Sequence, residues 1–177
     1  MPPNNENSEH RELKQSAYND AIKLLSRRNY SHFKLSEKLL IKGHSKEDID
    51  EAIAELIEAR LFNEAHYIES KVKGLMYKNW SAALIQQRLK QEHISIPTEE
   101  IEVIFEEHGY SKEQQIRSII DKKLLQLTRY RLPKDLEQLY WKLKEKLIIT
   151  ISAKGHNHYE FDQIINHRLK EHINRKP

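Results

Sequence analysis

Residues 28–61, RNYSHFKLSEKLLIKGHSKEDIDEAIAELIEARL, carry the pattern of two capped amphipathic helices joined at a glycine. Ser31 is placed to cap a first helix, and Gly43 stands where a left-handed residue commonly ends one. Ser45 is placed to cap a second helix. The apolar positions of the two helices are Leu35, Leu39 and Leu40, then Ile49, Ala52, Ile53, Leu56 and Ile57. This spacing predicts one helix–glycine–helix unit.

The same unit recurs along the chain. Asn29-Tyr30-Ser31 is repeated as Asn79-Trp80-Ser81, and Lys42-Gly43-His44-Ser45 is repeated as Lys154-Gly155-His156-Asn157. One more helical pattern precedes each copy, with apolar residues at Ala17, Tyr18, Ala21 and Leu25, at Ala65, Ile68, Val72 and Leu75, and at Ile116, Ile119, Ile120 and Leu127. Fortuitous similarity between capped helices is the alternative. The repetition predicts an all-α fold of three tandem three-helix modules that form an elongated, curved helical repeat.

The predicted modules are residues 15–61, 62–109 and 110–173, with the third the most diverged. Residues 1–14 and 174–177 are polar and unpatterned, which predicts flexible tails. Only four glycines and five prolines occur in the chain, so helices can continue and strand turns are scarce. The segment KLIITIS at 146–152 has a β-branched run typical of strands, but its apolar residues keep helical spacing. We therefore predict a helix there as well.

Three blocks of this sequence resemble the RecX family of regulators of the bacterial RecA recombinase. The first is LLSRRNYSHFKLSEKLLIKG, from Leu24 to Gly43, similar to the family's paired arginines followed by a leucine-rich helix closed by Lys-Gly. The second is Leu56–Tyr67, and the third runs from Lys73-Gly74 through Asn79-Trp80-Ser81 to Leu89. The resemblance extends from about Ser16 to about Leu169, which is nearly the whole chain.

The sequence also departs from the family pattern. Asn63 replaces an acidic residue, Lys71 and Lys73 stand where arginine is usual, and Asn79 and Ser81 replace glycines. The third module has a longer spacing between its aromatic residue, Tyr130, and its Lys-Gly pair. No single motif is specific, and the order and spacing of the three blocks carry the resemblance.

Charge is sorted by helix, although the net charge is only +3. The first and second helices of each module are basic, and the third helices of the first two modules are acidic. Alternation for solubility is the alternative interpretation. The predicted basic strip consists of Arg27, Arg28, Tyr30, Lys34, Lys38, Lys71, Lys73, Lys78, Trp80, Arg88, Lys122, Lys123 and Arg129. The predicted acidic strip, for a protein partner, consists of Asp48, Glu51 and Glu55.

A basic strip with aromatic residues at helix junctions is typical of contact with a polyanion, with the cations on phosphates and the aromatics on unstacked bases. An aromatic residue just before a cap can instead be a staple against its own helix. The helix–glycine–helix unit also suggests a helix-turn-helix reader of duplex DNA. Its recognition helix would begin Lys46-Glu47-Asp48, where carboxylates would face phosphates, so the charge disfavours this alternative.

Evidence for an enzyme is weak. The ten histidines form no His-Glu-x-x-His motif, and there is no glycine-rich phosphate loop. The histidines near residues 156–172 could gather a metal, but surface histidines are the ordinary interpretation. The chain has no cysteine and no long apolar run, so we expect no thiolate metal site, no cofactor and no membrane segment. We expect a cytoplasmic, monomeric protein that is not an enzyme.

The resemblance implies the partner. RecX-like proteins act on the RecA filament on single-stranded DNA, where they are thought to lodge in the groove and inhibit strand exchange and ATP turnover. The sequence therefore predicts a regulatory protein of recombination and repair that binds this filament and binds bare DNA weakly and without sequence preference. A row of modules suits that role because it can bridge successive RecA protomers.

Overall fold

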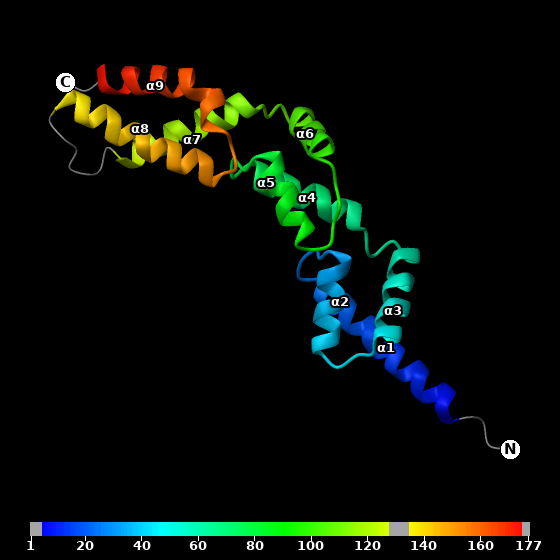
Figure 1. The fold of residues 1–177 in the computed structure, drawn as a ribbon. Coiled ribbons are helices and arrows are strands. Elements are labelled where there is room, and N and C mark those ends of the chain that lie inside the picture. The colour runs from blue at the N-terminus through cyan, green and yellow to red at the C-terminus, as the bar shows by residue number, and fades with distance from the viewer. Residues whose placement is uncertain (1–4, 128–134, 175–177) are drawn as a thin grey trace. The chain divides into compact units, whose positions relative to one another are not determined.

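The computed structural model describes residues 5–127 and 135–174, and the regular elements within these residues are all helices (Figure 1), which confirms the all-α prediction. The helices of this part of the chain are α1 (Asn5–Leu25), α2 (His32–Ile41), α3 (Lys46–Glu58), α4 (Glu64–Met76), α5 (Ala82–Lys90), α6 (Thr98–Glu107), α7 (Lys112–Leu127), α8 (Leu136–Ala153), the short 3-10 helix η1 (His158–Phe161) and α9 (Asp162–Asn174). None of these helices has the length and apolar character that crossing a bilayer requires.

Two compact units make up the structure. Unit 1 comprises Met1–Lys71 together with Leu89–Ser95, and unit 2 comprises Val72–Arg88 together with Ile96–Pro177. The long helix α4 and the shorter α5 therefore each contribute to both units. The division into three modules at residues 61 and 109 stays a prediction.

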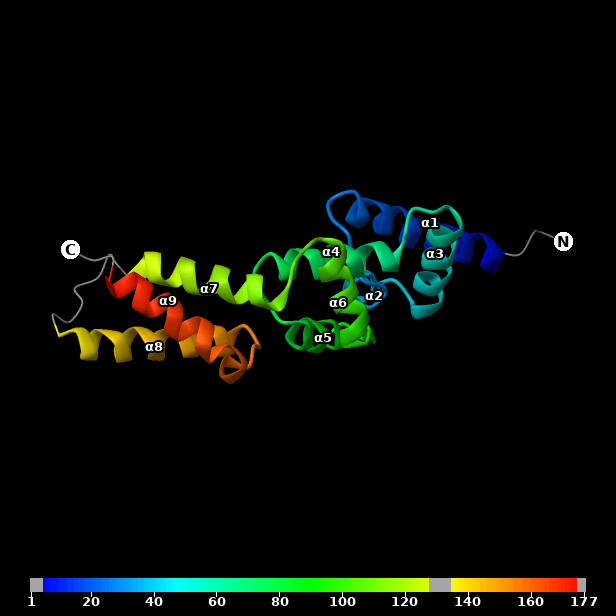
Figure 2. The same ribbon diagram turned by 90° about the horizontal axis from the view of Figure 1, so that it is seen from above.

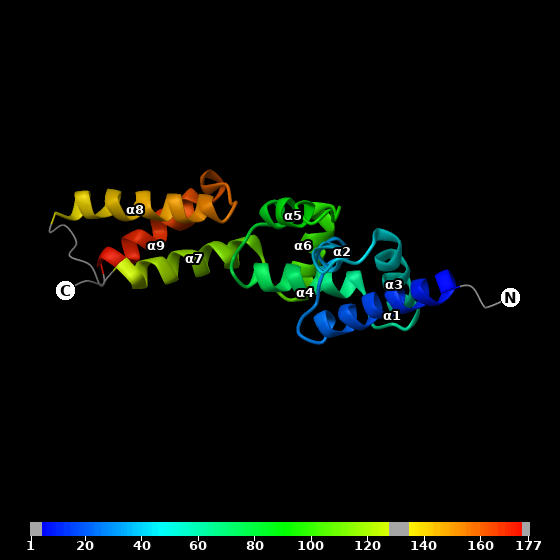
Figure 3. The same cartoon turned by 90° about the horizontal axis from the view of Figure 1, so that it is seen from below.

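Unit 1 is built on α1, α2 and α3, which pack against one another (Figures 2 and 3). Its core consists of Ala21, Tyr30, Leu35, Leu39, Ile49, Ile53, Leu56 and Phe62, all of them buried. Not every apolar position of the sequence pattern is in this core. Leu40 is 53% exposed and Ile57 is 52% exposed, because each lies at the outer margin of its helix's apolar face.

Unit 2 contains a bundle of α7, α8 and α9, which lie side by side in all three ribbon views. Its core consists of Ile116, Ile119, Ile120, Leu124, Leu127, Leu139, Leu143, Leu147, Ile151, Ile165 and Leu169. The segment 146–152 is part of α8, and both Leu147 and Ile151 are fully buried. The helical prediction for this β-branched run is confirmed, because packing of one helix face outweighs the weak local preference for strand.

The predicted serine caps are present. Ser31 accepts a hydrogen bond from the backbone N–H of Lys34 at 3.2 Å and caps α2. Ser45 accepts one from the backbone N–H of Asp48 at 3.1 Å, and its hydroxyl donates to the Asp48 carboxylate at 2.6 Å. This second arrangement satisfies a backbone N–H group in the first turn of α3 that has no partner within the helix. The Asp48 side chain is thereby buried, with 4% of the residue exposed.

Six helices of the described chain end with the same hydrogen bond, from one backbone N–H to the carbonyl five residues earlier. The donor–acceptor pairs are His44–Leu39, Leu61–Leu56, Trp80–Leu75, Ile94–Leu89, Tyr110–Phe105 and His156–Ile151. In each case the residue before the donor is left-handed: Gly43, Arg60, Asn79, His93, Gly109 and Gly155. This is the Schellman pattern, which satisfies carbonyls at the helix end. Only the glycine cases were visible as stop signals in the sequence.

The start of α1 corrects the predicted N-terminal tail. α1 begins at Asn5, so residues 5–14 are helical, although the sequence predicted an unpatterned tail up to residue 14. No glycine or proline separates this stretch from the amphipathic part of α1, and its Glu, Arg, Lys and Leu residues have good helix propensity. Extending an existing helix costs less than starting a new one, which explains the longer helix.

Asp20 of α1 ties the α2–α3 turn to unit 1. Its carboxylate lies 3.0 Å from Lys42 Nζ, 3.2 Å from His44 Nε2 and 3.4 Å from Lys23 Nζ. Hydrogen bonds from Lys42 and then His44 lower the pKa of Asp20 from 3.8 to about 2. Because the folded pKa lies below the unfolded one, the stabilisation is complete above the unfolded pKa and is lost as pH falls toward the folded pKa.

We expect Asp20→Asn to lower the free energy of unfolding by about 1 kcal/mol at neutral pH, since the pair is partly exposed and screened. The difference from the parent protein should shrink as pH falls from about 4 to about 2. Chemical denaturation over this pH range measures it. Asp50→Asn, on exposed α3, is the control and should change little at any pH. If the free energy of unfolding of Asp20→Asn stays equally far below that of the parent protein on acidification, the role assigned to the Asp20 carboxylate is wrong.

Candidate nucleic-acid interface

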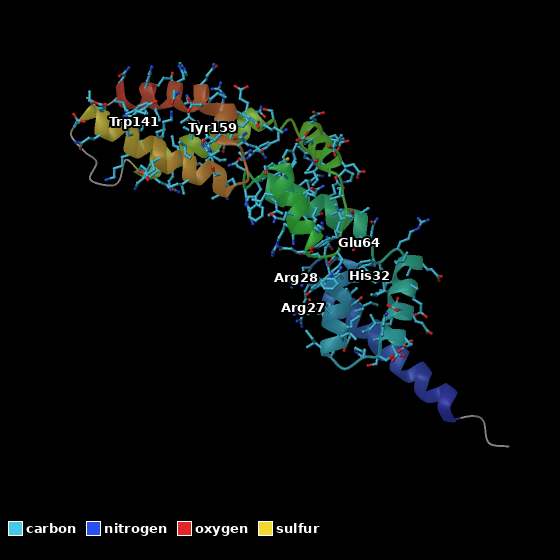
Figure 4. The ribbon with its side chains drawn as sticks, in the orientation of Figure 1. Arg27, Arg28, His32, Glu64, Trp141 and Tyr159 are labelled. Atoms are coloured by element: carbon cyan, nitrogen blue, oxygen red, sulfur yellow. The ribbon has the colours of Figure 1, made fainter. Side chains whose placement is uncertain are left out.

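Two arginines of the predicted basic strip, Arg27 and Arg28, lie just after α1. Arg27 and Arg28 are exposed on unit 1 (Figure 4). The Arg28 guanidinium carbon lies 4.6 Å from the centre of the Tyr30 ring, a cation–π distance. Tyr30 itself is only 8% exposed and belongs to the unit 1 core. The Tyr30 ring therefore has almost no exposed surface on which a base could stack, which favours the interpretation as a staple over the interpretation as a stacking platform.

The lysines of unit 1 differ in how far they are already engaged. Lys38 is exposed, whereas Lys34 Nζ lies 2.8 Å from the Glu37 carboxylate, and this hydrogen bond lowers the pKa of Glu37. Lys71 is part of an internal network: its Nζ lies 3.1 Å from Glu92, a residue only 6% exposed.

Tyr67 completes that network by donating a hydrogen bond from its hydroxyl to Glu92. Burial, together with this hydrogen bond, raises the pKa of Tyr67. Lys71 therefore serves the packing of unit 1, and we leave it out of the proposed interface.

The acidic residues of α3 are also not equivalent. Asp48 is buried as part of the cap that it forms with Ser45, so it is not available to a protein partner. Glu51 and Glu55 are exposed on α3, and each interacts with another residue of the chain. The sequence analysis grouped these carboxylates by charge alone, although Ser45 three residues before Asp48 has the spacing of a capping box and was the signal for this separate role.

In unit 2 the structure brings together cations that are far apart in the sequence. Lys78 follows α4, Lys122 and Lys123 lie on α7, and Lys154 follows α8. All four line one hollow of about 340 Å³, which we call the lysine hollow. Three of them belong to the predicted basic strip. Lys154 was not predicted, although its place in the repeated Lys-Gly pair was a signal in the sequence.

None of the four lysines of this hollow forms an ion pair within the described part of the chain. Lys154 Nζ instead lies 5.9 Å from the centre of the half-buried Trp80 ring. Like charges that share a concave surface repel one another and focus a positive potential there. An anion in the hollow would relieve this repulsion, so the arrangement suits phosphate groups.

The turn at residues 77–81 holds the hollow in place. The Asn79 side chain donates to Ser118 at 3.2 Å and accepts from the Tyr110 hydroxyl at 3.4 Å. Its carbonyl lies 3.0 Å from His156 Nε2, which is placed to donate to it, and burial lowers the pKa of His156. The Ser81 N–H donates to the Lys154 carbonyl at 2.9 Å. These bonds join the turn to α7 and to the end of α8.

The remaining basic residues of the strip are either engaged within the chain or outside the described residues. Lys73 and Arg88 each already interact with another residue. Arg129, with Tyr130, lies outside the described residues. Among the described residues no three side chains of metal-binding type come together. Of the histidines considered as ligands, His156 is engaged with Asn79, and His158 Nδ1 lies 3.3 Å from the Ser152 hydroxyl.

A second hollow, of about 420 Å³, lies in unit 1. The His32 and Glu64 side chains lie next to each other at its edge (Figure 4), and the His32 backbone N–H donates to Glu64 at 2.7 Å. Glu64 thereby supplies a carboxylate to the positive N-terminus of α2. The rings of Phe33 and His93 meet over this hollow at 4.3 Å between centres. Its polar groups are mostly engaged in holding unit 1 together.

Comparison with known proteins adds a family context. The family model described as the first three-helix domain of RecX matches residues 17–56. The regulatory protein RecX of Vibrio cholerae is 35% identical over 71 residues, which cover 40% of this chain and 47% of that protein. The match thus spans about half the length of this relative. The regulatory protein RecX of Haemophilus influenzae is 26% identical over 155 residues, which cover 88% of this chain and 96% of that protein.

One solved structure is similar as a whole. The crystal structure of RecX from Lactobacillus salivarius has a TM-score of 0.63 and 20% sequence identity, covering 90% of this chain and 97% of that one. At this identity the likeness shows a shared helical fold. The relatives in the sequence comparison are named regulatory proteins, not enzymes.

Proposed function

Because the chain belongs to the RecX family, we propose that it binds the RecA filament on single-stranded DNA and inhibits ATP hydrolysis and strand exchange by the recombinase. The match of residues 17–56 to the first RecX domain is the observation that carries the proposal. The exposed arginines after α1 and the lysine hollow support it, because a filament ligand must meet a phosphate backbone. Several weak contacts from one chain would add up to an avid interaction.

ATP hydrolysis by the cognate RecA on single-stranded DNA tests this proposal. Adding the purified protein in substoichiometric amounts should slow hydrolysis, since one chain would act on a filament of many protomers. The Ile53→Ala variant, destabilised in the core of unit 1, is the control and should inhibit less at a temperature where unit 1 unfolds. Unchanged hydrolysis at a full equivalent of the protein would refute the proposal.

We expect binding to bare DNA to be weak, independent of sequence and strongly dependent on salt. For four phosphate contacts on a single strand, affinity should fall about 50-fold between about 50 mM and about 200 mM salt, because binding rests on released counterions. Titrating labelled oligonucleotides of unrelated sequence at several salt concentrations measures it. A footprint at one sequence that survives at the higher salt would favour a helix-turn-helix reader of duplex DNA instead.

The acidic face of α3 is proposed to meet RecA, not DNA. Reversing Glu51 and Glu55 to lysine together should leave DNA binding unchanged or slightly tighter, because repulsion from phosphates falls. The same variant should inhibit RecA several-fold less well, with each exposed pair worth at most about 1 kcal/mol. DNA titration and ATPase inhibition, run in parallel, measure the two effects. Glu137→Lys with Glu145→Lys, two exposed carboxylates of α8, is the matched control. Equal inhibition by both double variants would remove α3 from the interface.

A further inference from the structure

We propose that the lysine hollow of unit 2 is a site for one unpaired nucleotide, with its phosphate among the lysines and its base on the ring of Tyr77. The inference rests on the proposed function, since it names the part of the protein that would contact the DNA of the filament. It goes further by assigning a ligand, a single-stranded phosphodiester, to a particular set of side chains. Tyr77 was not part of the basic strip predicted from the sequence.

The phosphate half of the inference rests on the four lysines. Three separate segments supply them, and the turn at residues 77–81 is bonded to the end of α8 through Ser81 and Lys154. A cluster of this kind, without carboxylate partners among the described residues, costs repulsion in the free protein. A phosphodiester removes that repulsion and satisfies several ammonium groups at once. A hollow of about 340 Å³ has room for a nucleotide but not for a duplex.

The base half rests on Tyr77, which lines the same hollow and is 56% exposed. Tyr110 meets it at 5.7 Å between ring centres and at 82°, an edge-to-face contact that limits rotation of the Tyr77 ring. A held, exposed aromatic beside a phosphate site is the arrangement on which unpaired bases stack. A base within a duplex is already stacked and cannot use it. The ring therefore favours a single strand over an acidic peptide, which would need only the lysines.

The first arm of the test is binding of a fluorescein-labelled oligothymidylate, followed by anisotropy. Lys122→Ala with Lys123→Ala should weaken binding about tenfold at low salt and reduce the salt slope by about 1.4, because two phosphate contacts are lost. Lys142→Ala with Lys170→Ala, two exposed lysines of the same unit outside the hollow, is the charge-matched control and should match the parent. Equal losses in both double variants would overturn the site and leave only a general charge effect.

The second arm separates base from phosphate. Tyr77→Ala should weaken oligothymidylate binding by about fivefold or more, a loss typical of one stacked base. It should not weaken binding of an abasic strand of the same length, and Tyr77→Phe should restore binding to oligothymidylate. An equal loss on both strands, or no loss on either, would overturn the stacking role of Tyr77. Denaturation of each variant shows whether it is folded, and Tyr77→Phe preserves the test if the alanine variant unfolds.

The source of the anion and the wider function are tested independently. Millimolar inorganic phosphate should not displace the oligonucleotide at constant ionic strength, whereas displacement would reassign the hollow to a free anion. If the hollow variants bind the oligonucleotide normally but fail to inhibit RecA, the lysine hollow would be reassigned as a site for a carboxylate of a protein partner. A further result would separate this site from the proposed function. If the parent protein does not inhibit RecA, while the hollow variants bind the oligonucleotide more weakly than the parent does, the proposed function fails and this site stands.

Discussion

Leu39→Ala is expected to lower the free energy of unfolding of unit 1 by about 2–5 kcal/mol, a large fraction of the stability of a domain of this size. The Leu39 side chain is fully buried in the core that α1, α2 and α3 share. Truncating it removes apolar contacts and leaves a cavity that a close-packed core fills only in part. Denaturant titration followed by circular dichroism measures the loss as a lower midpoint.

Leu40 provides a control within the same turn of α2. It is the same residue type, one position later, and it is 53% exposed. Leu40→Ala should change the free energy of unfolding by less than about 1 kcal/mol, since little apolar surface is removed from the interior and alanine favours helix. Similar losses in the two variants would mean that the packing of α2 against α1 and α3 differs from the one described.

Gly155→Ala is expected to destabilise unit 2 by about 2–5 kcal/mol, through two separate costs. Gly155 has φ +81°, a backbone conformation that an L side chain adopts only with strain. A Cβ at this position would also stand 2.5 Å from Ser81 Oγ and 2.7 Å from Leu84 Cβ. The second contact involves a side-chain atom next to the backbone of α5, so α5 would have to move away from the end of α8.

Gly43→Ala isolates the first of these costs. Gly43 is also left-handed, with φ +92°, but a Cβ there would meet nothing within 4 Å. Gly43→Ala should lower the free energy of unfolding by about 1–2 kcal/mol, because only the backbone strain of the left-handed conformation applies there. Thermal unfolding of both variants gives the comparison. If Gly155→Ala costs no more than Gly43→Ala, the end of α8 does not pack against the start of α5 as described. Because Ser81 and Lys154 are bonded there, Gly155→Ala should also weaken oligonucleotide binding by the lysine hollow.

The sequence by itself determined what depends on neighbours within about one helical turn. The caps at Ser31 and Ser45 and the left-handed stops at Gly43 and Gly155 are local hydrogen-bond arrangements, and each was predicted from a few residues. The helical state of residues 146–152 followed in the same way from the period of the apolar residues. Non-glycine stops at Arg60, Asn79 and His93 escaped detection, because these residue types adopt the left-handed region less readily than glycine and are common elsewhere, so they leave no comparable signal.

Tertiary structure alone decided which side chains are buried, which are paired within the fold and which remain available to a ligand. Leu39 and Leu40 are indistinguishable in the apolar pattern, and only the packing of α1 and α3 against α2 buries one and exposes the other. The internal ion pair of Lys71 is likewise invisible to charge counting, because a charge pattern does not record that Glu92 lies against Lys71 in the fold. The lysine hollow is the strongest case: Lys78 follows α4, Lys122 lies on α7 and Lys154 follows α8, and the folding of unit 2 brings their charges to one surface.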